Sequence, residues 1–250
     1  MSVMRPGIPA VTLYGIPFCK LGFRDTVDVL VQAVEAKAPT QVITANPIMV
    51  MTALENPEYM AMLQRAELIV PDGTGVVWAA GYVGKPVAEK VAGIELMHEL
   101  IRIGETRGWR VYLLGTDPET IRTAAAKLQE RYPKVVLAGY RDGYFRSDQD
   151  QAVIEEIRRA APDLLFVGRG ADTQEPWIDR YKAELGVPLI MGVGGSLDIL
   201  AGRLKRAPQW MIRLRLEWFY RLVKEPTRYK RMLVLPKFAI KVMKEKDKLK

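Results

Sequence analysis

The sequence contains very little cysteine and histidine. Its 250 residues include one cysteine, Cys19, and one histidine, His98. A lone cysteine forms no internal disulfide, and one residue of each type cannot build a cysteine/histidine zinc site. Cys19 has no neighbouring base, and His98 lies inside a helical pattern, so neither is a good candidate for a nucleophile or a ligand. The chain is therefore expected to be a cytosolic-type protein without disulfides.

Long hydrophobic runs are also missing. No uncharged stretch approaches the roughly 18 to 20 residues of a spanning helix, and residues 1–10 lack the apolar segment of a signal peptide. Hydrophobic residues nevertheless make up 49% of the chain. This is enough for a sizeable core, so we do not expect wholesale disorder.

Positive charge is concentrated at one end of the chain. Lys and Arg number 37 against 29 Asp and Glu, which gives a net charge of +8. Residues 203–250 hold sixteen basic and four acidic residues, a balance of +12, so residues 1–202 carry −4. This asymmetry indicates an anionic partner, such as a membrane surface, phosphate or nucleic acid.

Short β-branched runs alternate with segments of helical spacing along the body. Strands are predicted at residues 11–18, 41–44, 67–70, 110–115, 135–139, 164–168 and 187–192. Helices are predicted at residues 23–38, 93–107, 118–131, 148–160 and 175–185. The alternation predicts an α/β fold, a mostly parallel Rossmann-like sheet flanked by helices, with ligands bound at the carboxyl ends of the strands.

Polar residues follow two of these predicted strands. Asp72 precedes the turn Gly73-Thr74-Gly75, where a carboxylate can stand at the mouth of a cleft as a general base. The alternative for Asp72 is a turn or helix cap. Thr44 and Asn46 offer short hydrogen-bonding groups before Pro47, a favoured first residue of a helix, and capping is the alternative for Asn46.

A glycine-rich turn follows the last predicted strand. Its backbone N–H groups at Gly194 and Gly195 are suited to a phosphate, and Asp198 is suited to a ribose or base. The turn lacks the spacing of a dinucleotide fingerprint and no ribose acid follows, which disfavours a nicotinamide-dependent oxidoreductase. Asp148 and Asp150 follow Ser147 and are interpreted as a helix start in preference to a metal site.

Several motifs in one order carry a resemblance to a known family. They are Thr44-Ala45-Asn46-Pro47, Pro71-Asp72-Gly73-Thr74-Gly75, Asp142-Gly143-Tyr144-Phe145, Gln174-Glu175-x-Trp177, Gly192-Val193-Gly194-Gly195, Arg206-Ala207-Pro208-x-Trp210 and Leu216-Glu217-Trp218. From about residue 12 to 231 the chain resembles the WecG/TagA/CpsF glycosyltransferase family (family 26).

The resemblance implies an activity. It is the transfer of N-acetylmannosamine from UDP-N-acetylmannosamine to undecaprenyl-diphosphate-linked N-acetylglucosamine in the synthesis of the wall teichoic acid linkage unit. The transfer would invert the anomeric centre at the inner face of the cell membrane, without a metal or other cofactor. A related transferase that uses another UDP-sugar for a surface polysaccharide is the alternative.

The resemblance also assigns roles to residues. Asp72 is implied as the general base and Thr44 as its active-site neighbour, with Arg221, Arg228 and Arg231 reaching over the site. The implied substrate-binding residues are Asn46, Lys90, Tyr144, Gln174, Gly194, Gly195 and Asp198. Two positions depart from the family pattern. Lys90 stands where arginine is frequent, and the usual cation before Gln174 is missing, with Arg169 as a candidate substitute.

The basic tail completes the prediction. Residues 1–200 are expected to form the catalytic domain and residues 201–250 a helical, membrane-targeting appendage. Within the appendage, residues 208–224 and 227–246 have the pattern of amphipathic helices, separated at Glu225-Pro226 and interrupted by Pro236. Basic amphipathic helices bind an anionic membrane surface.

Three alternatives to a membrane-binding tail remain open. The first two are helices packed with a solvated basic face, and burial of the apolar stripe in a homo-oligomer. The third is a nucleic-acid-binding α/β protein, which would leave Asp72 and the glycine turns unexplained. We therefore expect no nucleic-acid partner.

Overall fold

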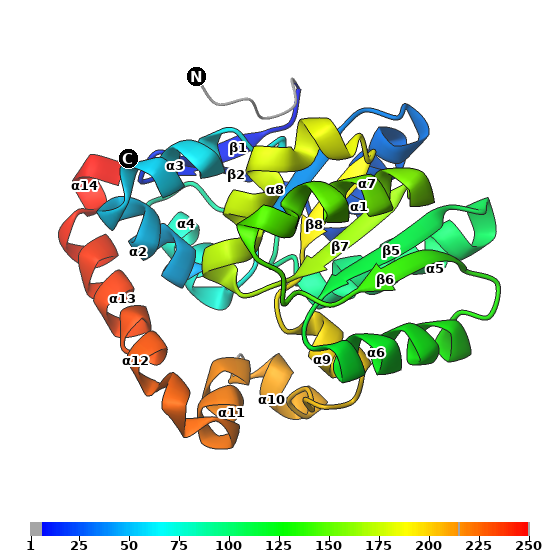
Figure 1. Ribbon diagram of the computed structural model, residues 1–250. Helices are drawn as coiled ribbons and strands as arrows, with labels where there is room; N and C mark the ends of the chain where they lie inside the picture. The colour runs from blue at the N-terminus through cyan, green and yellow to red at the C-terminus, as the bar shows by residue number, and fades with distance from the viewer. Residues whose placement is uncertain (1–6, 215, 250) are drawn as a thin grey trace.

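The centre of the computed structural model is a six-stranded parallel sheet (Figure 1). The structure describes residues 7–214 and 216–249, without the side chains of 171, 221, 228, 230 and 248. The strand order is β4-β3-β8-β7-β5-β6. The strands are β3 (Thr40–Ala45), β4 (Leu68–Pro71), β5 (Arg110–Gly115), β6 (Val136–Arg141), β7 (Leu164–Gly168) and β8 (Leu189–Gly192). The predicted α/β fold is confirmed.

Helices cover both faces of this sheet. On one face lie α1 (Phe23–Glu35), α5 (Gly93–Arg107), α6 (Pro118–Arg131) and α9 (Ser196–Leu200). On the other lie α2 (Pro47–Glu55), α3 (Pro57–Gln64), α4 (Thr74–Tyr82), α7 (Asp150–Ala160) and α8 (Ala171–Leu185). Val111 and Leu113 of β5 pack in one cluster, whereas Tyr112 and Leu114 pack in another. This alternation is expected when a sheet is buried on both sides.

The first predicted strand, residues 11–18, is wrong. The structure has an antiparallel hairpin instead, β1 (Ala10–Leu13) and β2 (Ile16–Cys19), outside the main sheet. Tyr14 and Gly15 form the turn with φ values of 53° and 81°. Positive φ at both central residues is the geometry that two-residue hairpins favour. The turn was not evident from the sequence, because tyrosine is an unusual residue at a positive φ.

Two predicted helices begin elsewhere. The segment predicted at 148–160 opens with a 3₁₀ turn, η1 (Ser147–Gln149), before α7. Helix α8 starts at Ala171, four residues before its predicted start, and contains Pro176 near its beginning. Pro176 is the sixth residue of this helix, so it lacks the N–H that would normally bond to the carbonyl four residues earlier. The helices predicted at 93–107 and 118–131 are confirmed by α5 and α6.

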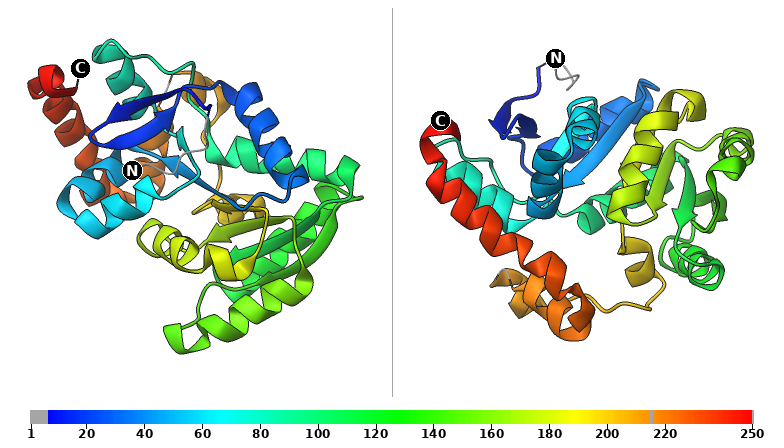
Figure 2. Two further views of the ribbon diagram at one scale, coloured as in Figure 1. Left: turned by 90° about the horizontal axis from the view of Figure 1, so that it is seen from above. Right: turned by 60° about the vertical axis from the view of Figure 1, so that its left-hand side comes forward.

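The tail forms an arc of short helices that runs from α9 to the far side of α2 (Figures 1 and 2). Its elements are α10 (Gln209–Arg213), α11 (Glu217–Lys224), η2 (Pro226–Arg228), α12 (Tyr229–Met232), α13 (Val234–Lys244) and α14 (Lys246–Leu249). The predicted break at Glu225-Pro226 is present. Pro236 does not interrupt a helix, since it lies in the first turn of α13.

The last long helix of the tail packs on the body. Phe238 and Val242 of α13 are buried in the same cluster as Met49 and Val50 of α2 and Val76 of α4. The tail is therefore attached to the α/β body at both of its ends. Within the described ranges, no helix is long and apolar enough to cross a membrane.

Candidate active site

The candidate site residues lie in loops that follow the six strands of the sheet. These loops meet at its carboxyl edge, because all six strands are parallel. Hydrogen bonds tie neighbouring loops together. The Asp72 N–H donates to the Ala45 carbonyl at 2.9 Å, and the Gly143 N–H donates to the Thr116 carbonyl at 2.8 Å. The Thr116 hydroxyl donates to Asp198 Oδ1 at 3.1 Å. The predicted strand ends thus form one continuous polar edge.

Asp72 lies directly after β4, with 30% of its side chain exposed. Its Oδ2 accepts the N–H of Gly93 at 3.3 Å, and its Oδ1 lies 3.9 Å from the ammonium of Lys90. Gly73 follows with φ = 132°, a conformation that favours glycine and allows α4 to start at once. The carboxylate is thereby fixed at the edge by backbone geometry while it remains accessible to a substrate.

Thr44 and Asn46 flank the Asp72 loop. A Cβ at Gly93 would lie 3.1 Å from both Oγ1 and Cγ2 of Thr44, so this glycine lets the start of α5 approach the threonine closely. Asn46 caps α2, since its Oδ1 accepts the N–H groups of Ile48 at 3.0 Å and Met49 at 3.3 Å. The capping alternative for Asn46 is therefore present in the structure, next to the Asp72 loop.

Gln174 is held inside the protein. Its Oε1 accepts the N–H of Gly194 at 3.1 Å, and its Nε2 donates to Glu175 Oε1 at 3.0 Å. The Gly194 N–H, predicted to face a diphosphate, is thus directed at a side chain. Gly194 has φ = 50° and open space beyond its Cα, so it is glycine for backbone reasons. Gly195 precedes α9 as its N-cap.

The sequence interpretation missed Glu175 and Gln41. Glu175 is buried, and its Oε2 accepts the Nε2 of Gln41 in β3 at 3.2 Å. Burial raises the pKa of Glu175 to about 7, against the opposing effect of the hydrogen bonds from Gln174 and Gln41. A signal was available, because Gln41 is a long polar side chain in a strand of a sheet covered on both faces, where it needs a hydrogen-bond partner.

The Tyr144 side chain is exposed to solvent, whereas the Arg169 side chain is fixed by hydrogen bonds. Tyr144 is 77% exposed, and its N–H donates to Asp142 Oδ1 at 2.9 Å. The Arg169 guanidinium donates to the carbonyls of Gly143 and Phe145, each at 3.1 Å, and lies 3.9 Å from the centre of the Phe145 ring. Arg169 therefore fixes the loop that presents Tyr144.

Two tail residues reach this edge. Glu217, at the start of α11, accepts a hydrogen bond from Lys90 Nζ at 3.3 Å. Arg231 of α12 lies 3.5 Å from Asp172 in the first turn of α8. The side chains of Arg221 and Arg228 lie outside the described residues. One contact joins the tail to the loop before α5, which contains Lys90, and the other joins it to α8. The tail therefore spans the carboxyl edge.

Other candidates lie away from the site. Asp150 accepts hydrogen bonds from Trp177 Nε1 at 3.0 Å and the Tyr181 hydroxyl at 2.9 Å, an internal structural role. Across the residues that the structure describes, no group of three histidine, cysteine, aspartate or glutamate side chains is arranged for a metal.

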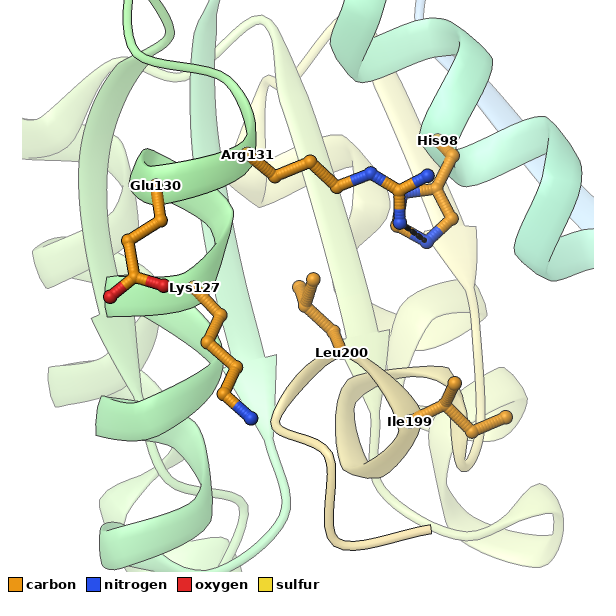
Figure 3. A pocket seen from close by; sticks show the side chains of 6 residues that line it. All are labelled: His98, Lys127, Glu130, Arg131, Ile199 and Leu200. Atoms are coloured by element: carbon orange, nitrogen blue, oxygen red, sulfur yellow. Dashed lines mark hydrogen bonds between the residues drawn. The ribbon is translucent and has the colours of Figure 1, made fainter. Parts of the chain in front are cut away.

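A separate pocket lies between α5, α6 and α9 and contains no predicted site residue (Figure 3). His98 lines it and contacts the Tyr132 hydroxyl at 3.0 Å. Burial, together with the charges of Arg131 and Arg206, lowers the pKa of His98 to about 4. His98 is therefore a neutral packed side chain at pH 7, as its helical pattern indicated.

The parallel sheet, the aspartate at its carboxyl edge and the convergent polar loops are those of an α/β enzyme. Residues 11–250 match the model of the glycosyl transferase WecG/TagA/CpsF family, and the chain belongs to that family. It is therefore a glycosyltransferase.

Curated relatives cover nearly the whole chain. A Bacillus subtilis (strain 168) protein is 35% identical over 241 residues, 96% of this chain and 93% of the relative. A Staphylococcus aureus (strain MW2) protein is 38% identical over 209 residues, 84% of this chain and 82% of the relative. Both are named N-acetylglucosaminyldiphosphoundecaprenol N-acetyl-beta-D-mannosaminyltransferase.

Proposed function

We propose that this protein transfers N-acetylmannosamine from UDP-N-acetylmannosamine to N-acetylglucosaminyldiphosphoundecaprenol, in synthesis of the wall teichoic acid linkage unit. The names of the two relatives specify this sugar and this acceptor. The observation that carries the proposal is the position of Asp72, a partly exposed carboxylate at the carboxyl edge of a family-typical fold.

Asp72 acts as the general base. Its carboxylate accepts the proton of the acceptor hydroxyl while that oxygen forms a bond to the anomeric carbon of the donor. The bond from this carbon to the diphosphate oxygen breaks in the same displacement, and UDP leaves with the electron pair. Attack from the face opposite the leaving group inverts the anomeric configuration. Thr44, in the strand beside Asp72, lines the same part of the edge.

The leaving diphosphate is stabilised by protein groups without a cofactor. Lys90 brings one cation to the edge beside Asp72. Arg231 brings another from the tail, and its side chain is 55% exposed, so a phosphate can compete for it with Asp172. Arg221 and Arg228 are proposed to join them. Preorganised cations of this kind offset the negative charge that develops on UDP.

The tail brings the enzyme to its lipid-linked substrate. Exposed apolar side chains lie along α10 to α12 among many basic ones: Trp210, Leu214, Trp218, Phe219, Val223, Tyr229 and Leu233. Aromatic residues beside lysine and arginine bind at the headgroup level of an anionic leaflet. We propose a peripheral position on the inner face of the cell membrane.

The decisive experiment offers donor and acceptor together. Purified protein is incubated with UDP-N-acetylmannosamine and a short-chain diphosphate-linked N-acetylglucosamine analogue, with and without EDTA. Released UDP is quantified and the product mass is measured. We expect a disaccharide-diphosphate-lipid product, inverted at the new bond and formed equally well in EDTA. Turnover of UDP-N-acetylglucosamine alone would instead favour a related transferase with a different donor, and loss of activity in EDTA would reject metal independence.

A further inference from the structure

A buried carboxyl group packs against the start of the glycine-rich turn at residues 192–195, and it has no role in the function proposed so far. Glu175, in the second turn of α8, is 1% exposed. Its Oε1 accepts Gln174 Nε2 at 3.0 Å, and its Oε2 accepts Gln41 Nε2 at 3.2 Å. A Cβ at Gly192 would overlap Glu175 Oε1, so the carboxyl group packs directly against the end of β8.

The glycine-rich turn needs restraints from neighbouring elements. It contains three glycines in four residues, and glycine leaves the backbone free to adopt many conformations. Val193 is held by β7, since its N–H donates to the Val167 carbonyl at 2.8 Å. Gly194, with φ = 50°, is held by Gln174, whose Oε1 accepts its N–H at 3.1 Å. Gln174 is therefore a side chain that restrains the glycine half of the turn.

The Gln174 amide has one acceptor end and one donor end, and only the acceptor end suits the Gly194 N–H. Because Glu175 offers an acceptor oxygen, it binds the Nε2 end and leaves Oε1 to face Gly194. The reversed amide would place two N–H donors together, which costs free energy in the interior. A carboxyl group keeps an acceptor oxygen even when it is protonated, so Glu175 selects this orientation in both protonation states.

We propose that Glu175 is a positioning residue that fixes the orientation of the Gln174 amide and thereby preorganises the turn at residues 192–195 for the diphosphate of the nucleotide-sugar. The inference rests on the proposed use of a UDP-sugar donor, whose diphosphate it places at this turn. A turn that is ordered before binding loses less conformational entropy when the donor binds. Glu175 itself touches no reacting atom, so its effect falls mainly on donor affinity.

The test starts from removal of the acceptor oxygens in the full-length protein. E175M keeps nearly the length of the side chain and removes both oxygens, so the Gln174 amide is no longer oriented. We expect the Kd for UDP, measured by calorimetric titration, to rise roughly tenfold, the order of one lost hydrogen bond. The KM for UDP-N-acetylmannosamine should rise by a similar factor, with kcat changed by less than about threefold. E175A makes the same comparison if E175M does not fold.

E175Q is the conservative variant and should retain donor affinity. The oxygen of the new amide accepts Gln174 Nε2, and its NH2 group then faces Gln41. Among the described residues nothing donates to Gln41 Oε1, so the Gln41 amide can turn over and accept this new donor. We expect a Kd for UDP within about twofold of the unaltered protein. A loss as large as that of E175M would mean that an acceptor at this position is not sufficient, and would overturn the proposal.

A double-mutant cycle with Q174A separates positioning from a general loss of packing. If Glu175 acts through Gln174, E175M causes no further rise in Kd in a Q174A background. If the two effects add, the proposal is overturned. D150N is the matched control, because Asp150 is also a buried carboxylate that accepts hydrogen bonds from two side chains, Trp177 and Tyr181. It should lower the melting temperature and leave the Kd for UDP within about twofold.

Hydrogen exchange gives a readout that does not depend on activity. In E175M the Gly194 N–H should exchange faster, while the Val193 N–H, which is bonded to β7, should be unchanged. Unchanged exchange at Gly194 would contradict the inference. Equal Kd values for UDP in E175M and the unaltered protein would overturn the inference alone, whereas absence of UDP binding by the unaltered protein would overturn the proposed function with it.

Discussion

At the scale of single residues, the proposed site centres on the Asp72 carboxylate, which contacts the Gly93 N–H and lies near the Lys90 ammonium. Asp72 is held by the Gly93 N–H and by its own N–H bonded to Ala45, while its side chain remains partly exposed. Its replacement should therefore affect chemistry far more than folding.

D72N removes the proposed proton acceptor and preserves the shape of the side chain. We expect kcat to fall by about 10² to 10⁴-fold, the typical contribution of a general base, while the Kd for UDP stays within about twofold. Steady-state kinetics and calorimetric titration with UDP provide the two measurements. D28N, on the exposed face of α1, is the control. Near-normal turnover by D72N would remove Asp72 from the base role.

Buried Glu175 links stability to pH. Its pKa in the folded protein is about 7, above the ordinary value of 4.5, so the folded state binds a proton that the unfolded state releases between these values. The stabilisation is fully present below about pH 4.5 and is lost as pH rises toward 7. Urea unfolding at several pH values should therefore show a decline in unfolding free energy between pH 5 and 7.

E175Q removes this titration. The decrease in unfolding free energy between pH 5 and 7 should be smaller in the variant by up to about 3 kcal/mol. This is the order expected when a pKa differs by about two to three units between the folded and unfolded states. The comparison concerns the slope with pH, since the new amide also changes the hydrogen bonds to Gln41 and Gln174. Parallel slopes in the two proteins would show that Glu175 does not carry the linkage.

At the scale of elements, close contact between α2 and α4 sets the position of the Asp72 loop. A Cβ at Gly75 would lie 2.6 Å from Cγ of Pro47, the residue that follows Asn46. Nothing lies within 4 Å of a Cβ at Gly81, in the same helix. These two glycines therefore make a matched pair, one required by packing and one not.

G75A should destabilise the protein by about 1 to 3 kcal/mol, because the added methyl pushes α4 away from α2. G81A should be neutral or should stabilise by up to about 1 kcal/mol, since alanine is the better helix former in open space. Thermal unfolding of both variants checks the pair. Equal effects of the two substitutions would mean that the contact between Pro47 and Gly75 yields easily.

Helix α13 is the element that fastens the tail to the body. Phe238 is 1% exposed, whereas Ile240 on the same helix is 48% exposed. F238A should cost about 3 to 5 kcal/mol at this contact, the typical loss for a buried phenylalanine, and should release α13 from α2 and α4. Limited proteolysis should then cut residues 201–250 much faster than in the unaltered protein. I240A should show the unaltered pattern, and equal protection in F238A would place the anchor elsewhere.

The elements themselves show how far sequence alone could go. Helices α5 and α6 follow from apolar spacing and from end signals, such as Asp117 before Pro118 and Gly108 after Arg107. The meeting of Asp72, Thr44 and Asn46 follows from parallel strands. The contact of Lys90 with Glu217 joins residues 127 positions apart, and no local pattern encodes such a distance. The bond of Gln174 to Gly194 likewise depends on how α8 packs on β8.

At the scale of the whole molecule, charge and exposed aromatic residues are separated from the catalytic body. The tail carries +12 against −4 for residues 1–202, and its exposed side chains include Trp210, Trp218 and Phe219. We expect flotation with vesicles that contain anionic lipid, weaker flotation with neutral vesicles, and a decrease as salt rises. Tight binding to an oligonucleotide without any binding to vesicles would instead favour the nucleic-acid alternative.

Attachment of the tail at both ends determines how substitutions in the tail affect its docking and the activity. The segment between α9 and α13 is held at both ends. When one contact in its middle is broken, the other residues of the segment therefore stay close to the carboxyl edge at high effective concentration. Loss of a single ion pair in this segment should therefore reduce activity only in part. Release of α13 leaves this segment attached to the body only at α9. Its return to the carboxyl edge then costs additional conformational entropy. Docking of the tail is therefore expected to survive the loss of one contact in its middle and to be lost when the contact of α13 with α2 and α4 is broken.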